Sequence, residues 1–411
     1  MLSGDNGLLK RAGDARDDTI VGQEKEQVEL AYISAAVKKL GDNVDKDDLQ
    51  DELDASVGEN KTTVTGSGTL KVKFEDTKNE YTVSQNGTVA KYEEVKTTDI
   101  YATVCTNGTN STLIFSNNES DINTYLTNNS TSVEDGYTIK NIKDDVYYWN
   151  SDDDYKDPAW IWNDTITKVI FLNTIVPKNT AEWFLGLQNL TDIENMRNLN
   201  TINVTDMNYM FGGCSSLTNL DLSSFDTSKV TDMGSMFYDC RNLSSLNISS
   251  FETSNVTDMN MMFTRCEKLT SLNVSSFNTS NVTNMHHMFS ECSLLTTISL
   301  NNFDTSNVID MTAMFSSCSS LTNLNLSGFN TSKVTITQGM FANCPSLTTI
   351  YASNLFNLSS VRGTNNQYNM FLNCSSLVGG NGTVYNSSYI DKTYARIDTA
   401  STPGYFTLKT N

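Results

Sequence analysis

Six cysteines stand 26 residues apart and are the residues of this chain with the most reactive chemistry available to them. They are Cys214, Cys240, Cys266, Cys292, Cys318 and Cys344. Such a column could bind a metal ion or form disulfides. However, equivalent side chains on stacked turns point in parallel, whereas zinc needs converging ligands, and parallel vectors keep Cβ atoms about 5 Å apart, beyond disulfide reach. We therefore expect each cysteine to be unpaired and to pack as a small hydrophobic residue in the core.

Other side chains that could bind a metal ion lack the partners that a metal site needs. His286 and His287 occur in one repeat only, without a repeated acidic or cysteine neighbour. The acidic run 152–154, with Asp157, lacks the glycine and the spaced ligands of a calcium loop, so we expect a solvated linker. A recurring column is expected to cap helices rather than to bind calcium, and it consists of Asp232, Asp258, Asn284 and Asp310. The sequence thus predicts no metal ion.

Catalysis has little support in this chain. It contains two histidines, and neither lies near a serine or cysteine nucleophile motif. It also has no glycine-rich phosphate loop. We expect no catalytic residues and no cofactor, and therefore a protein that is not an enzyme.

Small polar side chains form two further columns, and these are the candidate binding residues. The first column is Asn219, Ser245, Ser271, Thr297 and Asn323, and the second, two residues further on, is Asp221, Asn247, Asn273, Ser299 and Asn325. On a flat parallel sheet such side chains would form an adaptable hydrogen-bonding surface for a protein or a glycan. The alternative is a solvated face that serves only solubility, and the sequence leaves both open.

Each repeat contains two hydrophobic periods that would hold these columns in register. Residues 246–248 alternate apolar and polar side chains, which is typical of a half-buried strand. Met259, Met262, Phe263 and Cys266 fall at i, i+3, i+4 and i+7, which predicts a short helix with one buried face. One repeat cannot bury its own apolar face, so we expect the repeats to stack about 4.8 Å apart around a common core.

The complete repeat resembles that of the BspA-like leucine-rich repeat surface proteins of bacteria. Its template is Leu-x-x-Leu-x-Leu-x-x-Phe-x-Thr-Ser-x-Val-Thr-x-Met-x-x-Met-Phe-x-x-Cys, over roughly residues 165–411. It departs near the end, where Ile336 and Gln338 replace helix-start residues and Cys374 follows after 30 residues. The resemblance implies an α/β leucine-rich-repeat solenoid with a parallel sheet and short helices. It also implies an extracellular protein of the bacterial cell surface that adheres to host or bacterial surface proteins or glycans.

Both ends of the repeat array are expected to be closed. Residues 169–171 predict a closing strand, followed by a degenerate first turn with Trp183, Phe184, Leu187, Leu190 and Ile193. Residues 394–398 and 404–407 resemble the closing segment of the same family.

The N-terminal part predicts a helix followed by a small antiparallel sheet. Residues 20–40 have the spacing of an amphipathic helix ended by Gly41, and strands are expected at 69–74, 81–83 and 88–92. With the opening residues 1–9, this plan resembles type IV pilin-like proteins just after their hydrophobic stem. The resemblance implies an alternative role as a minor structural subunit of a pilus-like filament, with other pilin-like subunits as partners.

The expected domains are three. They are a pilin-like domain at 1–92, a connecting region with short strands and docking aromatics at 93–164, and the capped repeat region at 165–411. The net charge is −20, and no basic stripe is present to neutralise phosphates, which argues against nucleic-acid partners. No run of 18 apolar residues occurs, so we expect no direct membrane insertion.

Overall fold

A computed structural model divides the chain into two units, Met1–Val95 and Lys96–Asn411. It describes residues 24, 27, 28, 31, 32, 35, 46–57, 62–65, 70–74, 80–83, 89–92, 99–108, 110–129, 131–134, 140–141, 160–362 and 368–409. The predicted helix stop at Gly41, the hairpin turns at 78–79 and 86–87, the opening residues 1–9 and the acidic run 152–154 with Asp157 lie outside this set. None of the described helices is both long and apolar enough to cross a bilayer.

The first unit combines helical residues with a four-stranded antiparallel sheet. Within the predicted helix 20–40, every described residue is helical, and Val28, Ala31 and Ala35 are buried. The helix α2 (Lys46–Val57) precedes the strands β1 (Thr62–Thr65), β2 (Leu70–Phe74), β3 (Glu80–Val83) and β4 (Val89–Tyr92), which pair in chain order. The core of this unit is apolar, and the buried Tyr81 hydroxyl donates a hydrogen bond of 2.8 Å to Glu24.

The second unit begins with a mixed sheet that closes one end of the repeats. Its strands β5 (Tyr101–Thr106) and β6 (Ser111–Ser116) are antiparallel, and β6 pairs in parallel with β9 (Ile166–Phe171), which pairs with β10 (Asp192–Glu194). The short strands β7 (Ser132–Val133) and β8 (Lys140–Asn141) pair with β5, and helix α3 (Glu119–Asn129) lies between β6 and β7 in the chain. The predicted closing strand is therefore part of a larger sheet.

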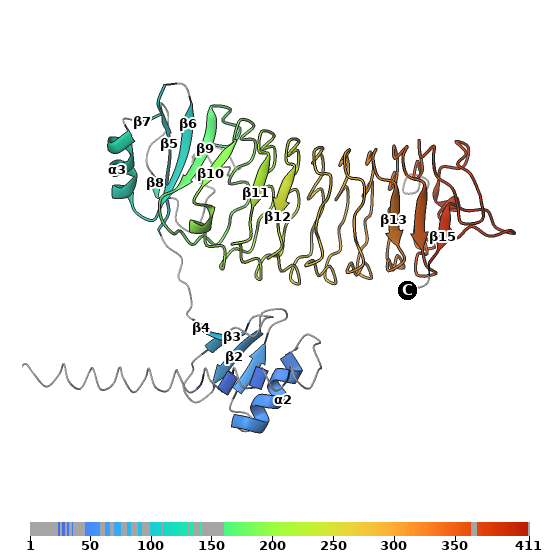
Figure 1. Cartoon of the computed structure of the whole chain (residues 1–411), viewed down its shortest axis with the longest axis horizontal. Helices are drawn as coiled ribbons and strands as arrows, with labels where there is room; N and C mark the ends of the chain where they lie inside the picture. The colour runs from blue at the N-terminus through green and yellow to red at the C-terminus, as the bar shows by residue number, and fades with distance from the viewer. Residues whose placement is uncertain are drawn as a thin grey trace, which may run out of the picture. The chain divides into compact units, whose positions relative to one another are not determined.

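The repeats lie side by side as stacked turns, coloured from green to orange in Figure 1. Their strands pair in parallel with the expected offset of one repeat. They are β11 (Asn219–Asp221) with β12 (Ser245–Asn247), and β13 (Asn323–Leu326) with β14 (Thr349–Ala352) and β15 (Phe406–Leu408). A second line of contacts joins successive repeats through single parallel bridges from Asp206 to Ile336. Short 3-10 helices occur at η1 (Met196–Asn198) and η2 (Lys392–Tyr394).

The predicted α/β leucine-rich-repeat solenoid class is wrong in two respects. The described repeats contain no α-helix, because α2 and α3 both precede them in the chain. Their strands form separate two- and three-stranded sheets rather than one continuous parallel sheet, and the described residues 271–274 and 297–300 contain no strand.

Two consecutive turns replace each predicted short helix. In the repeat of Cys266, the Met262 N–H donates to the Met259 carbonyl, and the Cys266 N–H donates to the Phe263 carbonyl. The third residue of each turn has positive φ, 51° at Met261 and 62° at Arg265, as in type II turns. Two such turns point four residues inward at the i, i+3, i+4, i+7 spacing of a helix. The intervening N–H groups bond to carbonyls of the next repeat, for example Phe263 to Met288 at 2.9 Å.

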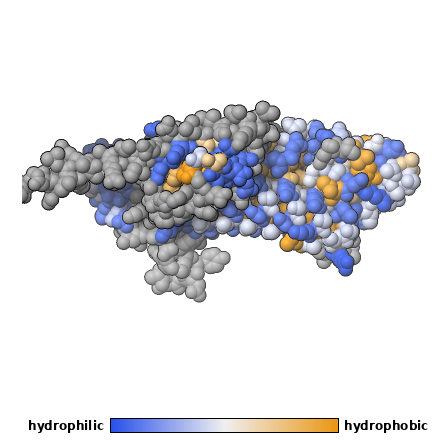
Figure 2. Space-filling model, turned by 90° about the horizontal axis from the view of Figure 1, so that it is seen from below, coloured by the Kyte–Doolittle hydropathy of each residue, from blue (hydrophilic) through white to orange (hydrophobic). Residues whose placement is uncertain are grey.

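One hydrophobic core runs through the second unit from Ile100 to Phe406. Its centre is a column of nearly parallel phenylalanine rings, with centroids 5.6 Å apart between Phe237 and Phe263 and 5.7 Å apart between Phe263 and Phe289. Stacking of identical side chains explains why the apolar pattern repeats so strictly. Seen from below, the coloured surface of the repeat region at the right of Figure 2 is mainly hydrophilic with separate hydrophobic residues.

Candidate functional site

The two polar columns predicted from the sequence lie on one face of the repeats, which we call the strand face. Nine of the ten side chains are exposed, and Asn325 is half-buried. The pairing of β11 with β12 places Asn219 beside Ser245 and Asp221 beside Asn247. The structure thus brings the predicted candidates together in regular rows, with the buried leucines of the same strands beneath them.

The second column of the strand face also shapes the backbone. The Ser223 N–H donates to Asp221 at 3.1 Å, and equivalent bonds run from Ser275 to Asn273 and from Ser327 to Asn325. The hydrogen bond from Ser223 lowers the pKa of Asp221 from its ordinary value. These side chains end each strand by turning the chain, as asparagine and aspartate do in Asx turns. They are therefore partly committed to structure.

The first column is freer to meet a partner. The side chains of Ser245, Ser271 and Thr297 are exposed and make no hydrogen bond within the described residues. They stand 26 residues apart on neighbouring repeats, so they present hydroxyl groups at the spacing of the stack. A partner could pair with several of them at once without breaking any internal contact.

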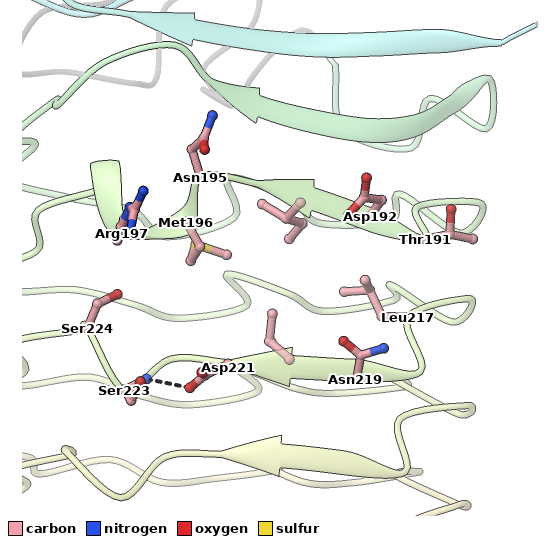
Figure 3. Close-up of a pocket in the computed structure, with 12 residues that line it drawn as sticks. Thr191, Asp192, Asn195, Met196, Arg197, Leu217, Asn219, Asp221, Ser223 and Ser224 are labelled. Carbon is pink, nitrogen blue, oxygen red and sulfur yellow. Dashed lines mark hydrogen bonds between the residues drawn. The ribbon is translucent and has the colours of Figure 1, made fainter.

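A groove of about 430 Å³ opens at the first end of the strand face. It exists because β10 and β11 belong to different sheets and do not pair. Between them Asn195, with φ 58°, starts the helix η1. Figure 3 shows Met196 and Leu217 in the gap, with Asp192 and Asn219 on the facing strands. The groove therefore combines an apolar floor with a polar rim and includes two of the predicted residues, Asn219 and Asp221.

The cysteine column is buried, as the sequence predicts, and the thiols are unbridged. Each thiol of the column donates a hydrogen bond to a phenylalanine carbonyl of the preceding repeat, at 3.1 Å from Cys240 to Phe211 and 3.2 Å from Cys292 to Phe263. Burial raises the pKa of Cys240 and of Cys292 to about 12. Because the reactive form is the thiolate, these cysteines are chemically inert in the folded chain.

The acidic column caps turns rather than helices. Asp258 accepts the Asn260 N–H at 2.7 Å, and Asp310 accepts the Thr312 N–H at 2.7 Å. The rings of His286 and His287 lie edge to face at 4.2 Å, and burial lowers the pKa of His287. Among the described residues, no group of three or more His, Cys, Asp or Glu side chains is placed to share a metal ion.

A third column, which the sequence analysis missed, joins the repeats through buried threonines. The Thr253 hydroxyl donates to the Asn278 carbonyl at 2.9 Å and accepts the Asn278 N–H at 2.8 Å. Comparable bonds to the next repeat are made by Thr201, Thr227, Thr279, Thr305 and Thr331. The signal was present as the invariant threonine of the Phe-x-Thr-Ser segment, but its polarity suggested an exposed loop.

The aromatic residues before the repeats separate into buried and exposed members. Trp160 is buried in the core, and its indole N–H donates to the Trp183 carbonyl at 2.7 Å. Trp162 is 60% exposed, although the sequence analysis expected it to dock. Tyr147, Tyr148 and Trp149 lie outside the described residues.

A family model described as Mycoplasma protein of unknown function, DUF285, matches residues 178–272 and 266–381. The matched stretch is 204 of the 411 residues and contains both columns of the strand face. No curated protein and no solved structure matches the chain. The repeats are therefore similar to a family whose printed description names no activity.

Proposed function

We propose that this chain is a binding protein of the bacterial cell surface whose strand face contacts a protein on a host cell, in the surrounding matrix or on another bacterium. The observation that carries the proposal is the pair of polar columns, with nine of ten side chains exposed and repeated in register. The resemblance to BspA-like surface proteins supports the same function. A glycan is the alternative partner for this face.

A protein fits the strand face better than a sugar for a chemical reason. All ten side chains are short, and none is an aromatic ring on which a sugar could stack. Repeated hydroxyl and amide groups can instead pair with the many backbone and side-chain groups of a broad protein surface. The flat, repetitive arrangement supports contact with a partner that spans several repeats.

The test is a charge substitution in the first column. We expect the combined substitutions Ser245→Lys, Ser271→Lys and Thr297→Lys to abolish binding of the full chain to immobilised matrix proteins or to whole cells. The control is Ser254→Lys with Ser280→Lys and Ser306→Lys, which adds the same charge at the same spacing outside the strand face. Equal binding of both triple variants and the unchanged chain would refute this function for the strand face.

The alternative role as a minor subunit of a pilus-like filament is a separate proposal. It is supported by the helical residues and the antiparallel sheet of the first unit. Co-purification of the chain with pilus-like filaments from the source cell would support it, and its absence from isolated filaments would argue against it.

A further inference from the structure

A second groove, of about 640 Å³, lies along the turns rather than the strands and shares no residue with the groove of Figure 3. We call it the turn groove. Its lining residues come from five successive turns, which at about 4.8 Å per turn extend over about 19 Å. This volume is within the range of about 300–1,000 Å³ usual for small-molecule sites. Its length suits a chain-like ligand.

Trp162 provides a flat, open ring at one end of the turn groove. It is 60% exposed, the highest exposure of any large aromatic side chain among the described residues. A Cβ on Gly186 would lie 2.3 Å from the Trp162 ring, so the ring rests directly on the glycine backbone. Gly186 supports one side of the indole, and solvent reaches the other.

Tyr209 repeats this arrangement on the next turn. A Cβ on Gly212 would lie 2.8 Å from the Tyr209 ring, so this ring also lies over a glycine. Tyr238 meets Tyr209 edge to face at 6.0 Å and holds it from the side. The groove thus has two aromatic platforms on neighbouring turns, each backed by a glycine.

The residues of the turn groove depart from the repeat at positions where departure is unfavourable. Tyr209, Met261 and His287 occupy equivalent turn positions with φ of 51°, 51° and 56°. Glycine and asparagine tolerate positive φ best, and later repeats use Gly339 and Asn369 at this position. Bulky side chains are therefore kept in the groove against the backbone preference. Retained backbone strain of this kind is typical of functional sites.

Charged groups of the turn groove are already paired with one another. Arg265 contacts Glu291 at 3.0 Å and Asp239 at 3.5 Å, which links three successive repeats. Burial lowers the pKa of His287, so its ring is largely neutral at pH 7. A charged ligand would have to compete with these ion pairs, whereas hydroxyl groups can add hydrogen bonds to them without breaking them.

We propose that the turn groove binds a neutral oligosaccharide. The C–H face of one sugar ring stacks on Trp162 and that of a following ring stacks on Tyr209, because the negative face of an aromatic ring attracts C–H groups. Arg265, Glu291 and the exposed Gln188 provide hydrogen-bonding partners for sugar hydroxyls along the rim. This site is independent of the strand face and of its proposed protein partner.

The proposal is tested by titrating the full chain with maltohexaose, cellohexaose, mannohexaose and chitohexaose in a calorimeter. We expect at least one of them to bind, and we expect Trp162→Ala and Tyr209→Ala each to weaken that binding about tenfold or more. The matched control is Tyr368→Ala, which removes another exposed aromatic ring, 48% exposed, outside the groove. A change at Trp162 leaves the core intact, and unchanged thermal unfolding of the variant verifies this.

Three outcomes would overturn the oligosaccharide site. They are absence of binding for every sugar at millimolar concentration, binding that Trp162→Ala leaves unchanged, and saturable binding of tetramethylammonium in place of any sugar. The strand-face lysine variant separates the two proposals, because it should lose protein binding and keep sugar binding.

Discussion

The buried threonine column offers the sharpest test of how the repeats are held together. Thr253 is 1% exposed, and its hydroxyl both donates to and accepts from the backbone of Asn278 in the next repeat. Thr253→Val keeps the shape of the side chain and removes only the hydrogen-bonding oxygen. The substitution leaves an N–H and a carbonyl of Asn278 without their partner.

The expected cost follows from these two groups. An unsatisfied buried backbone group costs about 1–3 kcal/mol, so two would cost about 2–6 kcal/mol. Asn278 is exposed, and water recovers part of this cost. The added methyl group of valine recovers about 0.8 kcal/mol through burial. We expect a loss of about 2–4 kcal/mol, whereas Thr253→Ser keeps both bonds, loses one methyl group and should cost about 1 kcal/mol.

Amide hydrogen exchange is the suitable assay, because a repeat array need not unfold in one step. In Thr253→Val the Asn278 amide should exchange about 30-fold faster or more, which corresponds to about 2 kcal/mol. Amides of distant repeats should change less. If Thr253→Ser accelerated exchange as much as Thr253→Val, packing of the methyl group rather than the hydroxyl would hold the repeats together, and the reasoning would be refuted.

Three further predictions concern the thiols, the C-terminal end and the strained turns. Cys292 should resist thiol reagents at pH 8 until denaturant is added, and because its pKa is raised to about 12 from near 9, stability should fall as the pH rises above about 9. Asp398→Asn should cost about 1–3 kcal/mol, because this carboxylate accepts hydrogen bonds from Asn381, Thr383 and Gly404. Burial alone would raise the pKa of Asp398, but these bonds lower it, so its contribution should be present at neutral pH and lost in acid, which thermal melts of both proteins across acidic pH would show. Ser317→Gly should stabilise by about 0.5–1 kcal/mol because φ is 60° there, whereas Ser316→Gly, beside it, should destabilise by a similar amount, and thermal denaturation would contradict this if both destabilised.

The sequence predicts the inward and outward sides of each repeat but not the local backbone. The 26-residue spacing places Cys266 in the core and Asn273 on the surface, because every repeat must meet its neighbours in the same way. The spacing of Met259, Met262, Phe263 and Cys266 is equally compatible with a helix and with two type II turns. The residues that would distinguish them are glycine or asparagine at positive φ, and this repeat instead has methionine and arginine there.

The candidate site was predictable to the extent that it repeats. The strand face follows from periodic polar residues, whereas the groove between β10 and β11 arises from an interruption in pairing that no local pattern announces. Trp162 and Tyr209 come together only because residues far apart in the chain stack over Gly186 and Gly212. Such contacts depend on the three-dimensional path of the turns.

The difference between the two surfaces bears on how each would bind. An inward substitution disturbs the contacts with two neighbouring repeats, so variation accumulates outward, where it disturbs none. On the strand face the outward residues stay small and alike, which spreads a partner over many weak contacts, and a single substitution there should matter little. In the turn groove the outward residues differ from turn to turn, which fixes a ligand at one place. Loss of Trp162 alone should therefore weaken binding more than loss of any single strand-face residue.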